Sequence, residues 1–302
     1  MSKRNLALVG ATLVSLIYGL TFTIAKDVMP QYIDAYGFIL LRVAGSTVLF
    51  WLIWLLMIGV GSVPKEKIAL NDIPRIAASA FFGVALNMLT FFKGLSLTSP
   101  ISAAVIMVST PMIVLALSAM IMKERMKKRM VLGIVLGLIG TALLILYGKS
   151  IGNAPNAGFG NFLVLVNAVS YGFYLIIVRK LLDKYNAFTF VKWIYFFGFL
   201  MVLPFGWSQF ETVDWTLVPT DIYWKIGFVV VFSTFVTYLL NLLSMRELKP
   251  TTIAVFIYLQ PLFATIFAIS LGKDELSLVK IGSALLIFVG VYLVTQKKTN
   301  SQ

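Results

Sequence analysis

Two cations inside apolar stretches of this chain are the first candidates for chemistry. Arg42 falls in the apolar run 35–60, and Lys93 falls in the run 76–97. A charge inside a membrane span is costly and marks a functional site by default. Lys93 follows Thr90 by about one helical turn, and its ammonium would suit the carboxylate of an amino acid or another anion. Both side chains also lie near enough to a helix end to snorkel to the membrane surface, which we favour, more strongly for Arg42.

Other reactive groups are missing from the sequence. The chain has no Cys and no His, and its 12 acidic residues all fall in loops or at the ends of apolar runs. This excludes disulfides, thiolate nucleophiles, histidine relays, and zinc or haem sites that need Cys or His. An enzyme in the membrane would lack an acid–base pair, and a proton-coupled pump commonly places Asp, Glu or His inside a span. We therefore expect no enzyme, no cofactor and no metal.

Two prolines, Pro111 and Pro261, are the strongest local indications of a site. A proline within a helix lacks an N–H and clashes with the carbonyl four residues earlier, so Met107 and Ile257 should each present a free carbonyl. Such carbonyls are tolerated in a membrane only inside protein or against a water-filled cavity. A structural kink satisfied by a neighbouring helix is an equally supported alternative.

These prolines belong to an internal duplication with an offset of 150 residues, from 111 to 261. The recurring pairs are Pro100 and Pro250, Ala104-Val105 and Ala254-Val255, Pro111 and Pro261, Lys123-Glu124 and Lys273-Asp274, and Gly140 and Gly290. A repeat of this kind decides the architecture before any single motif does.

Composition places the chain in a bilayer. It is 60% hydrophobic and 12% charged, with a mean hydropathy of +0.94, whereas a soluble domain is about 45–50% apolar and about 25% charged. A membrane helix needs about 20 mainly apolar residues. Ten runs meet this requirement: 6–25, 35–60, 76–97, 101–122, 130–148, 159–178, 188–207, 222–245, 251–271 and 281–296.

The basic residues predict orientation. Most of the 25 Lys and Arg residues fall in loops on the side of the N-terminus, so both termini should be cytoplasmic. Five spans per half is an odd number, so the second half must cross the membrane in the opposite direction. The loop 123–129 (KERMKKR) is strongly basic and its counterpart 273–280 (KDELSLVK) is not, as opposite orientation requires.

The predicted fold is therefore an all-α integral membrane protein with ten transmembrane helices in two inverted five-helix repeats. Residues 1–148 form the first repeat, 149–158 a Gly-, Pro- and Asn-rich linker, 159–296 the second repeat, and 297–302 a cytoplasmic tail. We expect a multi-pass protein of a bacterial inner membrane or a plasma membrane. The net charge of +13 is scattered over loops, so we expect no nucleic-acid partner.

Polar residues at helical spacing mark faces on the first, third, sixth and eighth spans. Polar membrane faces turn inward, so together with the two proline-bearing spans they should line one central cavity. The candidates for substrate contact are Ser15, Tyr18, Asn87, Thr90, Lys93, Thr110, Pro111, Tyr171, Tyr174, Thr237, Tyr238, Asn241, Tyr258, Gln260 and Pro261. An interhelical hydrogen bond is the simpler explanation for any single one of them. Glycines on the fifth and tenth spans predict close helix packing, within the fold or between subunits, so monomer and homodimer stay open.

The segment 94–124 (GLSLTSPISAAVIMVSTPMIVLALSAMIMKE), followed by a Gly-rich span, resembles the EamA repeat of the drug/metabolite transporter superfamily, and residues 250–290 are similar. The resemblance covers nearly the whole chain. It implies ten transmembrane helices, a central cavity, alternating access and transport of small metabolites, often amino acid export. No substrate residue is identified by motif.

We therefore predict a secondary transporter of a small-molecule substrate, exporting an amino acid or a related metabolite. A drug efflux transporter is the alternative, weakened because the first span lacks the glutamate that small multidrug antiporters of this superfamily place there. An integral membrane enzyme is the rival from another class.

Overall fold

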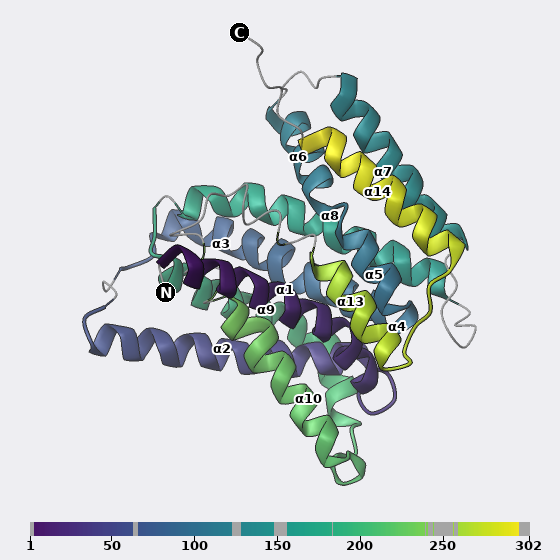
Figure 1. The fold of residues 1–302 in the computed structure, drawn as a ribbon. Coiled ribbons are helices and arrows are strands. Elements are labelled where there is room, and N and C mark those ends of the chain that lie inside the picture. Colours follow the sequence, from purple (N-terminus) through teal and green to yellow (C-terminus); the bar gives the residue numbers. More distant parts are fainter. Residues whose placement is uncertain are drawn as a thin grey trace.

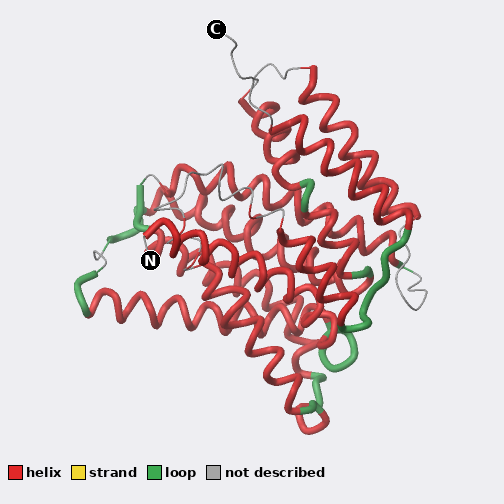
Figure 2. The backbone as a smooth tube through the Cα atoms, viewed as in Figure 1, coloured by secondary structure: helices red, strands yellow, loops and turns green. Residues whose placement is uncertain are grey.

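The computed structural model describes residues 3–62, 66–122, 128–147, 156–182, 184–238, 240, 244, 256 and 259–295, and the regular structure within them is helical (Figure 1, Figure 2). Within these residues, six helical stretches are long and apolar enough to cross a membrane. They are Asn5–Val28, Ala35–Gly59, Leu70–Leu97, Lys128–Tyr147, Ala157–Val178 and Phe188–Glu211. The chain is thus a multi-pass α-helical membrane protein.

The first half begins with two long helices and continues through a composite third one. Its elements are α1 (Lys3–Val28), α2 (Ala35–Gly59), η1 (Leu70–Asp72), α3 (Ile73–Ala80), η2 (Phe81–Ala85), α4 (Leu86–Leu97), α5 (Pro100–Met107), α6 (Thr110–Met122) and α7 (Lys128–Tyr147). The second half follows the same order. Its elements are α8 (Ala157–Leu182), α9 (Ala187–Glu211), η3 (Trp215–Leu217), α10 (Thr220–Val230), η4 (Val231–Val236), α13 (Leu259–Ser270) and α14 (Leu278–Thr295).

The duplication is visible in the backbone. The two segments η2 and η4 are π-helical, and they begin at residues 81 and 231, which is the offset of 150 that relates the prolines. A π-helical turn is rare and occurs mostly as a bulge inside an α-helix, frequently at functional sites. Two such turns at equivalent positions indicate that the halves share local backbone irregularities as well as the order of their helices.

The equivalent helices α2 and α9 pack against each other and run antiparallel. The backbone at Gly37, near the start of α2, approaches that of Gln209, near the end of α9. Further along α2, Thr47 Oγ1 donates a hydrogen bond to the carbonyl of Tyr195 over 3.1 Å. Residue numbers therefore rise along one helix as they fall along the other.

The equivalent helices α7 and α14 are also antiparallel neighbours, side by side in Figure 1. Gly140 faces Ser283, where an added Cβ would lie 2.8 Å from a carbonyl oxygen, and Gly290 faces Gly133 in the same way, at 2.5 Å. Only glycine permits backbones to approach this closely. Helix packing within the fold thus explains these two glycines.

A second pair of contacts joins the first helix of each half to the proline-bearing helix of the other. Gly19 on α1 packs against Phe263 on α13, and Gly172 on α8 packs against Leu117 and Ile113 on α6. Ile113 and Phe263 are equivalent residues, each two positions after a repeated proline. Exchanging the halves therefore maps one pair of helices onto the other, α1 with α13 and α8 with α6, although the two glycines are not at equivalent positions.

The predicted span 101–122 is broken rather than kinked. Helix α5 ends at Met107 and α6 begins at Thr110, so Val108 and Ser109 separate the two pieces. Thr110 Oγ1 donates to the Met107 carbonyl over 2.7 Å, so the carbonyl that Pro111 frees is satisfied locally. The equivalent carbonyl of Ile257 lies outside the described residues.

Candidate functional site

Arg42 lies at the contact between the halves. It projects from α2 and is 8% exposed. Its Nε donates to Thr234 Oγ1 over 2.8 Å, and its Nη2 donates to the carbonyl and hydroxyl of Ser233 over 3.3 and 3.4 Å. The guanidinium also lies 4.8 Å from the centre of the Phe92 ring. The side chain is thus held between α2, α4 and the π-helical segment η4.

The prediction that Arg42 snorkels to the membrane surface is wrong. A π-helical turn bonds residues five apart, so it leaves a carbonyl without its usual amide, and a side chain from elsewhere can bind it. In η4 the Ser233 carbonyl accepts hydrogen bonds from the side chains of Arg42 and Thr237, and the guanidinium turns inward to reach it. The sequence gives no sign of this because the partner lies 191 residues away.

The charge of Arg42 is not neutralised by any acid among the described residues. Among the residues that the structure describes, no carboxylate forms an ion pair with Arg42, and its Nη1 has no hydrogen bond. A buried charge without a partner costs several kcal/mol or more, and such residues in membrane proteins mark substrate or ion pathways. The planar fork of a guanidinium suits a carboxylate or phosphate. The arrangement can therefore accept an anionic group.

Tyrosines surround this position. Tyr18 on α1 and Tyr195 on α9 lie within electrostatic range of Arg42. Tyr174 on α8 lies within electrostatic range of both of them, and Tyr238, just after η4, lies within the same range of Tyr174 and Tyr195. We call these four residues the tyrosine cluster. Phe50 packs against it, with ring centres 4.7 Å from Tyr195 and 5.2 Å from Tyr238. Helices of both halves thus contribute to one polar aromatic centre.

The other π-helical segment also accepts a side chain from the opposite half. Ser170 Oγ, on α8 of the second half, donates to the Phe82 carbonyl in η2 of the first half over 2.7 Å. Each π-helical turn is therefore bound by a polar side chain of the opposite half. The two contacts are not equivalent in the repeat, since Ser170 lies on α8 and supplies a neutral hydroxyl, whereas Arg42 lies on α2 and supplies a charge.

Three predicted substrate residues make hydrogen bonds between or within helices. Asn87 on α4 and Asn167 on α8 pair reciprocally, each amide donating to the other backbone carbonyl, over 3.3 and 2.8 Å. The hydroxyls of Thr90 and Thr237 donate to carbonyls one turn back in their own helices, Leu86 and Ser233. The simpler explanation, a hydrogen bond between or within helices, accounts for these three residues.

The remaining candidates are placed as follows. Ser15 is buried and donates to the Phe256 carbonyl over 2.6 Å, which joins α1 to the second half. Tyr171 is partly exposed and packs on Tyr174, with ring centres 5.7 Å apart. Pro111 lies at the start of α6, and Gln260 and Pro261 lie at the start of α13. Asn241 and Tyr258 lie outside the described residues.

Lys93 does not join the tyrosine cluster through any contact that the structure describes. Its ammonium lies 5.8 Å from the centre of the Tyr36 ring, in the first turn of α2. The side chain thus extends toward the helix ends, as snorkelling predicts.

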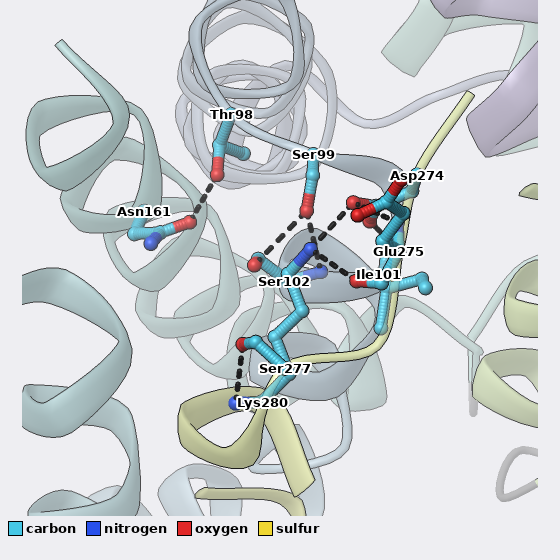
Figure 3. Close-up of polar contacts among 9 residues, drawn as sticks. All are labelled: Thr98, Ser99, Ile101, Ser102, Asn161, Asp274, Glu275, Ser277 and Lys280. Atoms are coloured by element: carbon cyan, nitrogen blue, oxygen red, sulfur yellow. Dashed lines mark hydrogen bonds and ion pairs between the residues drawn. The ribbon is translucent and has the colours of Figure 1, made fainter. Parts of the chain in front are cut away.

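The loop after α13 contains a polar network that the sequence only hinted at (Figure 3). Asp274 accepts the backbone amide of Ile101 at the start of α5 over 3.1 Å and pairs with Lys280 over 2.5 Å. Asp274 and Lys280 are 2% and 3% exposed. On the same side, Lys26 donates to the carbonyls of Leu95 and Ser96 at the end of α4. In the sequence, the only indication of this network was that Lys123-Glu124 recurs as Lys273-Asp274 in the internal repeat.

The fold and this site define a multi-pass α-helical membrane protein of two similar halves with a cation at their contact. These features are typical of membrane transporters. Comparison with known proteins agrees. The model of the EamA-like transporter family matches twice, over residues 5–146 and 158–296. The chain belongs to the EamA-like transporter family.

Individual relatives are also named as transporters. The uncharacterized transporter YetK of Bacillus subtilis (strain 168) is 24% identical over 257 residues, which cover 84% of this chain and 76% of YetK. An uncharacterized transporter of Archaeoglobus fulgidus is 26% identical over 281 residues, covering 93% of this chain and 95% of that protein. A crystal structure with 16% identity superposes with a TM-score of 0.60 over 97% of both chains, which shows the same fold.

Proposed function

We propose that the protein exports amino acids, or related metabolites that carry a carboxylate, as a secondary transporter. Arg42 carries this proposal: it is buried at the contact between the halves, it has no acidic partner among the described residues, and its Nη1 has no hydrogen bond there. A substrate carboxylate would complete the site. The tyrosine cluster supplies hydroxyls and ring faces for the rest of a small polar molecule.

We further propose ten spans in two inverted halves, residues 1–148 and 159–296, with both termini in the cytoplasm of a bacterial inner or plasma membrane. The antiparallel packing of α2 on α9 and of α7 on α14 supports the inversion, because equivalent helices of inverted halves must run in opposite directions. The number ten rests on the ten apolar runs of the sequence, of which 222–245 and 251–271 lie only partly in the described residues.

Alternating access is supported by two ion-pair clusters that join the halves at equivalent places. In the Asp72 cluster, Asp72 before α3 binds Lys184 after α8 and lies 3.7 Å from Arg75. In the Lys225 cluster, Lys225 on α10 binds Asp27 at the end of α1 over 2.9 Å. Arg75 and Lys225 are equivalent, 150 residues apart.

In both clusters the acid that joins the halves comes from the first half and the base from the second. Asp221 of the second half also pairs with Lys225 over 3.1 Å. Inverted halves that rock about a central site would break one cluster while keeping the other. We propose that they close opposite ends of the pathway.

The test is counterflow of radiolabelled amino acids into liposomes that contain the purified protein, with and without a pH gradient. We expect uptake of at least one amino acid by the wild-type protein and its loss in Arg42→Gln, which keeps hydrogen-bonding groups but removes the charge. Lys93→Ala is the matched control, since that cation lies at the helix ends, and it should transport normally. Counterflow by none of the amino acids would refute the substrate assignment.

A further inference from the structure

A second buried cation lies away from Arg42. Lys192, on the second turn of α9, is 3% exposed. Its ammonium rests against the ring of Trp54 and lies 4.5 Å from the ring centre of Trp51 and 5.6 Å from that of Trp193. Trp51 is nine residues after Arg42 on α2, about 13 Å along the helix axis. This position is therefore distinct from the proposed substrate site.

Three hydrogen-bond donors in this position have no acceptor among the residues that the structure describes. The indole Nε1 groups of Trp51 and Trp54 are buried and lack a partner. Lys192 likewise has no hydrogen bond and no ion pair within the described part of the chain. An indole N–H and an ammonium can only donate. Leaving them buried without an acceptor is unfavourable, and a cation–π contact offsets only part of that cost for the ammonium.

The same residues line a cavity of about 500 Å³ between α2, α3, α9 and the segment before η1. Glu66 and Lys67 lie at its loop side. One carboxylate oxygen of Glu66, Oε2, accepts the backbone amide of Asn186 over 2.8 Å, so it is already engaged. The cavity is therefore large enough for a small molecule and is lined by unpaired donors.

We propose that this Lys192 pocket, lined by Trp51, Trp54, Glu66, Lys67 and Lys192, binds a phosphate group. A phosphate presents several acceptor oxygens and a negative charge, which match two indole donors and one ammonium. A carboxylate has fewer oxygens to share among three donors.

A phospholipid headgroup is the source that the surroundings favour. Leu52, Leu55 and Leu56 are exposed on α2 beside the two tryptophans, as expected of a face that contacts acyl chains. Tryptophan and lysine near a helix end are typical of the membrane interface, where headgroups lie. The loop side of the cavity, with Glu66 and Lys67, would face that interface.

The experiment is thermal unfolding of the delipidated full-length protein in detergent, with added phosphatidylglycerol or with inorganic phosphate. The variants are Lys192→Met and Trp54→Phe, which removes the N–H and keeps an aromatic ring. Their matched controls are Lys180→Met and Trp224→Phe, both exposed in the structure. Each shift in midpoint is measured against the same variant without ligand, so an intrinsic loss of stability does not count.

We expect phosphatidylglycerol to raise the unfolding midpoint of the wild-type protein. In both pocket variants, the lipid concentration needed for the same shift should be about tenfold higher or more, because each variant loses one charge-assisted or indole hydrogen bond. The controls should match the wild type. A Lys192-dependent shift with inorganic phosphate would support the site and assign it to a soluble anion. Equal shifts in the wild type and both pocket variants would overturn the proposal.

Discussion

The hydroxyl of Thr234 accepts a hydrogen bond from Nε of Arg42 over 2.8 Å, and this contact joins α2 of the first half to the π-helical segment η4 of the second. Thr234 itself donates weakly to the Val229 carbonyl, five residues earlier, over 3.3 Å. One hydroxyl thus stabilises both the irregular turn and the charge that it holds. The anion-accepting geometry of Arg42 therefore depends on a residue that need not touch the substrate.

Replacing Thr234 with valine tests this dependence. Valine preserves shape but removes the acceptor, which leaves Nε buried without a partner at a cost of about 1–3 kcal/mol. We expect a lower unfolding midpoint in detergent and weaker substrate binding in liposomes. Thr234→Ser keeps the hydroxyl and is the control. Wild-type stability and transport in Thr234→Val would show that the contact is dispensable.

Glycine at position 19 is predicted to be essential for contact between the halves. An added Cβ would lie 2.5 Å from the Cβ of Phe263 and 3.0 Å from the backbone nitrogen of Ala264. We expect Gly19→Ala to destabilise the fold by about 1–3 kcal/mol, as overpacking does. The change is measured as a fall in the unfolding midpoint by intrinsic tryptophan fluorescence.

Gly282→Ala is the matched control for that substitution. It is also a helical glycine, on α14, but an added Cβ there meets nothing within 4 Å. Alanine over glycine in a soluble helix is worth about 0.5–1 kcal/mol, so we expect no loss of stability. Equal losses at both positions would mean that α1 and α13 are not in this close contact.

The large-scale organisation could be predicted from the sequence because it depends on the internal repeat and on the distribution of apolar residues. The repeat of Pro111 as Pro261 predicted the two halves, and the apolar runs predicted the helices that the structure describes. The break at Val108 and Ser109 was anticipated only as a kink, because a proline shows which carbonyl loses its amide but not how far the helix separates.

The candidate site was harder to predict because it depends on which helices touch. Arg42 was found as a cation in a span, but its partner in η4 is set by tertiary packing and by a π-helical turn, for which residue types give no local signal. Lys192 could have been singled out in the same way, since Trp51 and Trp54 share a helical face. Their meeting with Lys192 requires the pairing of α2 with α9.

Opposite orientation of the halves is tested with cysteines, because the native chain has none. Val60 after α2 and Leu217 after α9 follow equivalent helices and are 80% and 75% exposed. We expect Val60→Cys to be labelled by a membrane-impermeant maleimide only in inside-out vesicles and Leu217→Cys only in intact cells. Labelling of both from one side would refute the inverted arrangement, and the cysteine-free parent controls for background.

The two ion-pair clusters lead to a prediction about conformational balance. Asp72→Asn removes the acid that joins Lys184 to the first half, whereas Asp27→Asn removes the acid that joins Lys225 to the first half and leaves its pair with Asp221. Each cluster joins the halves at one end, so the two variants should shift the accessibility of a cysteine near Arg42, for example Thr47→Cys, in opposite directions. Exposed ion pairs are weak, so we expect a several-fold change in labelling rate rather than an all-or-none effect.

The pH dependence of the Asp72 cluster provides an independent check. The hydrogen bond to Asp72 raises the pKa of Lys184 above its usual value. The contribution of this lysine is then fully present below the pKa of an unfolded lysine, about 10.4, and is lost only as pH rises through the higher folded value. The thiolate is the form that reacts, so the labelling rate itself rises with pH. The ratio of the rates with and without Asp72→Asn, measured at the same pH, should therefore be constant from about pH 6 to pH 9, where an unfolded lysine stays mostly protonated. In the charge-swapped pair Asp72→Lys with Lys184→Asp, the wild-type labelling rate should return. If the swap fails to restore it while both single variants fold, the cluster does not act by pairing charges across the halves.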